Sequence, residues 1–155
     1  MDVERKDWVR ALTAHPVSRL NATADQLAAV CTVRLTRLPQ AGLGLLSLID
    51  GALHESYYLG EFPLSTCSVE LAFPDGRQAE GGAQVMADDA ELARSLAIFD
   101  AILAARLPGW EQVAELVTSG ALQRGAENGR RRAMLAATRV DFALLSDADE
   151  DTDEY

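Results

Sequence analysis

The order of apolar and polar residues along the chain predicts four to five β-strands, since residues 139–145 are either a late strand or an extended arm. Strict alternation, typical of half-buried strands, occurs at residues 31–37, 64–73 and 139–145. Residues 43–49 form a short apolar run, which suits a central strand. A fifth strand is expected at residues 78–86, directly after the second alternating segment. The strands follow one another along the chain, which favours antiparallel pairing.

Turn residues separate these strands. Residues 39–42 contain both proline and glycine and predict a turn between the first two strands. Residues 74–76, Pro-Asp-Gly, predict a hairpin between the segments 64–73 and 78–86. Gly81 and Gly82 weaken the returning strand, so we expect a bulge or a close approach of another backbone there.

Helical patterns lie on both sides of the strand region. Residues 3–14 and a stretch from Pro16 to about residue 30 are expected to be helical. Asp88 is predicted to cap a long helix, with Glu91 three residues later. Residues 110–117 predict a short helix ended by Gly120, and a further helix is expected at 121–138. The long helix carries an apolar face formed by Leu92, Leu96, Phe99, Leu103 and Leu107.

Helices, then consecutive strands, then helices indicate an α+β fold. We expect a mainly antiparallel sheet of about four to five strands, with helices at its ends or on one face. The 155 residues suffice for one core, so residues 1–146 are expected to form a single domain. Six acids crowd into residues 147–155, and we expect this tail to be disordered. These acids are Asp147, Asp149, Glu150, Asp151, Asp153 and Glu154.

Charge and composition narrow the classes of function. The net charge is −10, of which the tail contributes six, and a polyanion such as nucleic acid would be repelled. No stretch reaches the roughly 20 apolar residues of a membrane span, and no export signal is evident, so a cytoplasmic protein is expected. Cys31 and Cys67 lack metal-ligand spacing and are expected to be reduced, buried thiols.

The sequence contains no self-sufficient catalytic motif. Its two histidines, His15 and His54, have no carboxylate or cysteine at ligand spacing, so no metal site is expected and surface or capping roles are favoured. The basic residues gather at Arg130, Arg131 and Arg132, which fan over about 300° of a helix. A solvated helix face is favoured there over a contact with phosphate or an acidic partner.

Several collinear segments resemble one protein family. They include Trp8 with Leu12, then residues 39–43, then residues 59–61 leading into 65–69, and then residues 93–103. The most specific is the segment 138–142, Thr-Arg-Val-Asp-Phe. In this order and spacing the chain resembles the PhnG family, the small G subunit of the bacterial carbon–phosphorus lyase core complex, over nearly its whole length.

The resemblance implies a function that needs partners. With its H, I and L companions, such a subunit supports displacement of the base of a purine nucleoside triphosphate by a phosphonate. The product is a ribose 1-phosphonate 5-triphosphate, whose carbon–phosphorus bond a radical iron–sulfur subunit later cleaves. The resemblance also implies packing on the larger I-type subunit, with other core subunits nearby and no cofactor in this chain.

The resemblance also suggests residues to watch. Glu61 and Arg139 are weak candidates for a catalytic role, although an ion-paired or capping role suits them equally. The candidates for a partner interface are Arg139, Val140, Asp141 and Phe142. The family pattern has arginines where this chain has Ser47, Ile49, Thr66 and Asp88, which removes groups suited to phosphate oxygens.

Three hypotheses therefore remain open. The chain is an accessory subunit of the phosphonate-to-nucleotide transferase, or a standalone enzyme that uses Glu61 and Arg139 on a phosphorylated substrate. The third hypothesis is a non-enzymatic interaction module with an altered role, whose acidic tail carries the function.

Overall fold

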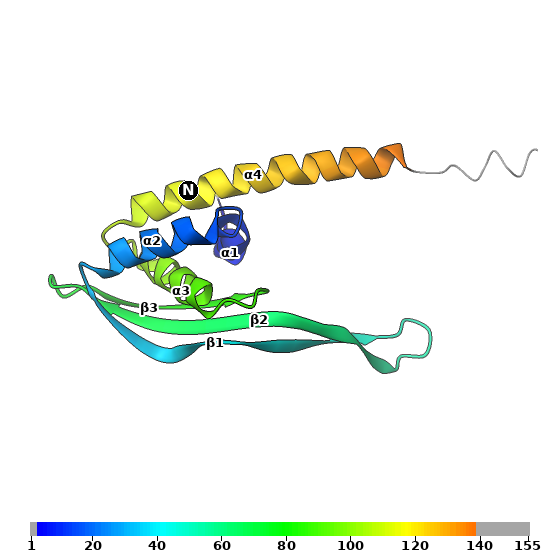
Figure 1. Ribbon diagram of the computed structural model, residues 1–155, viewed down its shortest axis with the longest axis horizontal. Coiled ribbons are helices and arrows are strands. Elements are labelled where there is room, and N and C mark those ends of the chain that lie inside the picture. The colour runs from blue at the N-terminus through cyan, green and yellow to red at the C-terminus, as the bar shows by residue number, and fades with distance from the viewer. Residues whose placement is uncertain (1–2, 139–155) are drawn as a thin grey trace, which may run out of the picture. The chain divides into compact units, whose positions relative to one another are not determined.

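The computed structural model describes residues 3–138, which form helices and a three-stranded antiparallel sheet in the order β1-β2-β3 (Figure 1). The chain divides into two compact units, residues 1–123 and 124–155. The elements are the 3-10 turn η1 (Arg5–Asp7), α1 (Trp8–Leu12), α2 (Val17–Ala28), β1 (Thr32–Ile49), β2 (Ser56–Ala72), β3 (Gln78–Val85), α3 (Ala90–Ala105) and α4 (Trp110–Ala137).

The predicted α+β class and antiparallel pairing are confirmed, whereas the expected four to five strands are not found among residues 3–138. The segments 31–37 and 43–49 belong to one long strand, β1, so the turn predicted at residues 39–42 is wrong. The chain stays extended there because a register shift between Arg37 and Gln40 accommodates the extra residue. Pro39 lies within that irregularity, where a missing N–H costs the ladder little. The strand predicted at 139–145 and the tail 147–155 lie outside the described residues.

The β2–β3 hairpin forms where it was predicted. The backbone N–H of Phe73 donates to the carbonyl of Arg77 at 2.9 Å, and Gly76 takes a φ of +86° in the turn. The predicted close approach is confirmed at Gly81, where a Cβ atom would collide with the Ala97 carbonyl oxygen of α3. Glycine therefore lets β3 lie directly against the backbone of α3.

The core lies between the sheet and the helices. Cys67, Val69 and Leu71 are buried on the face of β2 that α3 covers, as their alternation predicted. The five residues of the predicted apolar face at 92–107 are all buried. Cys67 is buried and Cys31 half-buried, both are free thiols, and burial raises the pKa of each.

The N-terminus of α3 begins one residue later than predicted. Asp89, not Asp88, is the N-cap: its carboxylate accepts the N–H of Leu92 at 2.9 Å, and its backbone is extended. Asp88 is exposed, one position too early to reach this N–H group. The helix ends at Arg106, which adopts the left-handed conformation with a φ of 48°.

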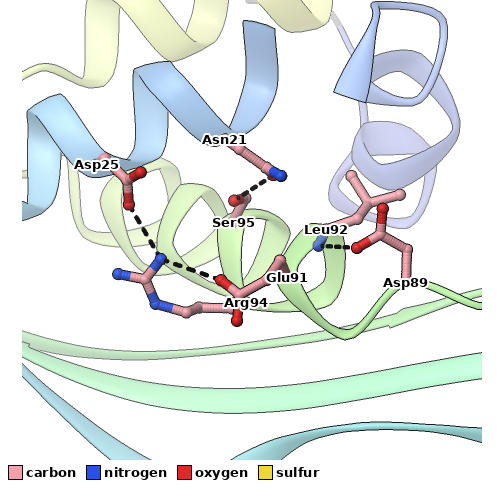
Figure 2. A network of polar contacts seen from close by, with 7 residues as sticks. All are labelled: Asn21, Asp25, Asp89, Glu91, Leu92, Arg94 and Ser95. Atoms are coloured by element: carbon pink, nitrogen blue, oxygen red, sulfur yellow. Dashed lines mark hydrogen bonds and ion pairs between the residues drawn. The ribbon is translucent and has the colours of Figure 1, made fainter. Parts of the chain in front are cut away.

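A small polar network joins α2 to α3 (Figure 2). The Arg94 guanidinium contacts the carboxylate of Asp25 on α2 at 3.0 Å and that of Glu91 at 3.6 Å. Asn21 lies one turn before Asp25 on α2, and its Oδ1 accepts a hydrogen bond from the buried hydroxyl of Ser95 at 2.8 Å. These contacts fix how α2 lies on α3, while burial of Leu20, Ala24 and Leu27 supplies the apolar part of the interface.

The prediction that Gly120 ends a short helix is wrong, because the single helix α4 continues through it. Gly120 is buried, and a Cβ atom there would collide with the Ala11 carbonyl of α1, so this glycine serves packing. His15 contacts the Leu116 carbonyl through Nε2 at 2.8 Å, which gives this histidine a structural role. In the second unit, Arg124 pairs with Glu127 at 3.1 Å, and Arg130, Arg131 and Arg132 are exposed on the helix as expected.

Candidate functional site

The most unusual surface of the first unit is the outer part of the β1–β2 ribbon. β3 pairs only with residues 65–72 of β2, whereas β1 and β2 continue to pair from Gly42 opposite Leu64 to Ile49 opposite Ser56. Residues 42–64, which we name the arm, therefore form a two-stranded ribbon that extends past β3 and α3 (Figure 1). A two-stranded ribbon has little stability of its own in water, so the ribbon needs a further source of stabilisation.

Large apolar side chains cover the arm without being buried. The exposed fractions are 69% for Leu43, 72% for Ile49 and 68% for Tyr58. Alternation along β1 places Leu43 and Leu45 on one face of the ribbon, and a register shift follows between Leu46 and Ser47. Single exposed leucines are ordinary, but many large exposed apolar side chains on one short ribbon are typical of a surface that binds another molecule. The exposed members of the group are Leu43, Leu45, Leu46, Ile49, Leu53, Tyr57, Tyr58 and Leu59.

Local contacts hold the arm in shape. The ring of Phe62 lies over Gly44, so closely that a Cβ atom on Gly44 would collide with it. At the tip, the Asp50 carboxylate accepts the N–H groups of Ala52 at 2.6 Å and Leu53 at 2.8 Å. These two hydrogen bonds lower the pKa of Asp50. The arm is thus a formed hairpin with a hydrogen-bonded tip.

Glu61, one of the two catalytic candidates, lies on the arm. It pairs with Leu45 across the ribbon, is exposed, and forms no ion pair with any residue between 3 and 138. Its predicted companion Arg139 lies outside the described residues, as do the interface candidates Val140, Asp141 and Phe142. Glu61 therefore lies opposite an apolar residue on the exposed arm.

The positions at which the resemblance leads us to expect arginines do not lie on one element. Ser47 and Ile49 lie on the arm, with alternate residues on one face of β1. Thr66 lies on β2 within the three-stranded part of the sheet, and Asp88 precedes α3. The strand register therefore separates Ser47 and Ile49, which lie beyond β3, from Thr66, which pairs with Gln84 of β3.

The described residues contain no cluster of metal ligands. Between residues 3 and 138, no three His, Cys, Asp or Glu side chains gather where they could hold a metal ion. The buried hydroxyl of Ser65 donates to the Ala87 carbonyl at 2.7 Å and accepts the Asp89 N–H at 3.0 Å, so it fixes the entry into α3. In the same range, no helix combines the length and apolar character needed to cross a membrane.

The sequence pattern did not predict the arm. The apolar run 43–49 predicted a central strand, and this is wrong because β1 is at the edge of the sheet and these residues are largely exposed. A signal was available in Tyr57, Tyr58 and Leu59, a second apolar group close enough in sequence to pair with the first.

Comparison with known families shows to which family the chain is related. Residues 3–146 match the family described as "Phosphonate metabolism protein PhnG". The chain belongs to the PhnG family. The match covers nearly the full chain and confirms the resemblance inferred from the collinear segments. No curated protein matches the chain. Family membership places this PhnG-family chain in phosphonate metabolism, and the arm is the surface to be explained within it.

Proposed function

We propose that this chain is an accessory subunit of the carbon–phosphorus lyase system in the cytoplasm. In this role it supports transfer of a phosphonate to the ribose of a purine nucleoside triphosphate with loss of the base. It binds a larger I-type subunit through the arm, and the other core subunits complete the reaction centre. Membership of the PhnG family supports the metabolic context.

The exposed arm is the observation that carries the proposal. Its apolar side chains face water in the isolated chain, and burying one leucine completely contributes about 1.5–3 kcal/mol. A partner that covers several of them would stabilise both the complex and the two-stranded ribbon. The aromatic side chains Tyr57 and Tyr58 suit the centre of such an interface.

The partner contact is proposed to extend to the segment beyond the described residues. Arg139, Val140, Asp141 and Phe142 lie within the region that matches the family, and they stay interface candidates. Glu61, exposed opposite an apolar residue on the arm, fits a polar contact with the partner better than unaided catalysis.

Co-purification tests the proposal with a matched pair of variants. The tagged chain is expressed in its native host, and the bound chains are identified by mass analysis. Leu43→Asp on the arm should lower recovery of the larger subunit at least about tenfold, because it places a charge in the apolar interface. Leu122→Asp is the control, since Leu122 is equally exposed at 72% but lies on α4. Equal recovery with both variants, or no larger partner with the unmodified chain, would contradict docking through the arm.

The standalone enzyme remains the second candidate, because Glu61 is a carboxylate that no described residue neutralises. The purified chain is mixed with adenosine triphosphate and methylphosphonate, and released adenine is measured. Release that Glu61→Gln abolishes would establish this candidate. No release from the intact chain ends it.

A further inference from the structure

A second feature lies on the face of the sheet opposite α3. A shallow depression of about 300 Å³ spans all three strands in their paired region. Its side chains come from Arg37 on β1, Thr66 and Ser68 on β2, and Gln84 on β3, with Gly82 between them. None of these residues belongs to the arm.

The strand register explains why these groups meet. Arg37 pairs with Ser68, Ser68 with Gly82, and Thr66 with Gln84, so they occupy two adjacent rows across the sheet. Because side chains alternate between faces, Thr66 and Ser68 point away from the core that buries Cys67 and Val69. The rows therefore gather a guanidinium, two hydroxyls and an amide on one face.

The depression exists because Gly82 has no side chain. A Cβ atom there would have Ser68 Oγ at 3.5 Å and the Cys67 carbonyl at 3.8 Å, which is ordinary contact distance. A Cβ atom would thus fit at Gly82 without a clash, unlike at the neighbouring Gly81, where the backbone of α3 fills the space. Register shifts on both sides of Arg37 alter the local twist of β1, a device that re-aims side chains.

The charges favour an anion over a cation. The residues lining the depression include one cation and no acid. Arg37 forms no ion pair with any residue from 3 to 138, whereas Arg34, on the same strand, is paired with Glu70. Arg37 can therefore direct its N–H groups to a ligand, and the hydroxyls and the Gln84 amide add donors that suit oxyanion oxygens.

We propose that this depression binds a single tetrahedral oxyanion, the head group of a phosphate ester or of a phosphonate. Arg37 supplies the charge and the main hydrogen bonds, while Thr66, Ser68 and Gln84 position the remaining oxygens. Because the site is open and carries one cation, the isolated chain should bind inorganic phosphate with a Kd on the order of 1 mM. The site is independent of the arm, so either proposal can fail while the other stands.

Titration of the full chain with inorganic phosphate tests the site. Backbone amide NMR shifts are followed at constant ionic strength, with sodium chloride replaced stepwise by sodium phosphate. We expect saturable shifts at residues 66–68 and 82–84. Arg37→Gln should weaken binding at least about tenfold, because a charge-assisted pair is lost. Arg19→Gln, which removes the same charge from exposed α2, should leave it unchanged.

A second variant separates binding from folding. Gly82→Val fills the depression without removing a charge, and valine is favoured in strands. We expect it to abolish the phosphate shifts while the Tm and the circular dichroism spectrum stay native. Linear shifts without saturation, or equal affinity of Arg37→Gln and the unmodified chain, would overturn the proposal.

The source of the head group is distinguished by two further titrations at the same ionic strength. Saturable shifts with methylphosphonate alone identify a phosphonate site, and shifts with adenosine triphosphate alone identify a nucleotide phosphate site. Shifts with both identify a general tetrahedral oxyanion site. Shifts with neither, in a chain that also fails to bind inorganic phosphate, contradict the proposal.

Discussion

The two parts of the β1–β2 ribbon contain similar apolar residues but bury them differently. In the three-stranded part, Val69 and Leu71 are completely buried beneath α3. On the arm, Leu43 and Ile49 in the same ribbon remain about 70% exposed. Hydrophobicity is therefore not what separates the two parts. The difference lies in the neighbours, since β3 and α3 cover one part and end before the other.

Truncating one leucine in each part should give the largest difference in the free energy of unfolding. Leu71→Ala removes a fully buried side chain and should lower the free energy of unfolding by about 2–5 kcal/mol. Leu43→Ala removes an exposed one and should change it by no more than about 0.5 kcal/mol. Urea unfolding followed by circular dichroism measures both. Similar losses would mean that the arm is already covered in the isolated chain.

Substituting one glycine in each part should give a smaller difference in the free energy of unfolding, in the same direction. Gly81→Ala drives a methyl group into the backbone of α3 and should cost about 1–3 kcal/mol. Gly42→Ala on the arm meets nothing within 4 Å and should be neutral or slightly stabilising. The same urea experiment compares them. A destabilised Gly42→Ala variant would indicate that an unseen contact crowds the arm.

The fold class, the hairpin at 74–76 and the buried faces of β2 and α3 could be predicted because local pattern and tertiary environment agree there. The family could also be recognised, from segments spread over the chain. Three details were wrong because a long-range contact or local backbone geometry overrides the local signal. Pro39 is absorbed by a strand irregularity, Gly120 packs against α1, and Asp89 takes the cap position that Asp88 was expected to hold.

The arm was harder to predict because its exposure depends on whether a third strand or a helix covers the ribbon. An apolar run such as 43–49 has the same composition whether a helix or water lies beside it. The depression at Arg37 depends on register across three strands, since its residues are up to 47 positions apart in sequence. Neither kind of information is contained in a local window of sequence.

The smallest expected effect concerns the tip of the arm and its response to acid. The N–H groups of Leu53 and Ala52 hydrogen-bond the Asp50 carboxylate and lower its pKa below the ordinary value of 3.8. Because the pKa in the folded tip lies below that of the unfolded chain, ionised Asp50 supports the tip above about pH 4. This support is lost as the pH falls through the lowered pKa.

Amide shifts of residues 52 and 53 should therefore move together in an acid titration, with a midpoint below 3.8. Asp50→Ala should remove this midpoint while the amides of the three-stranded part keep their shifts. A midpoint at or above the ordinary value would show that the tip opens in solution, and the arm would then reach its partner as a looser ribbon than the comparison with the covered part assumes.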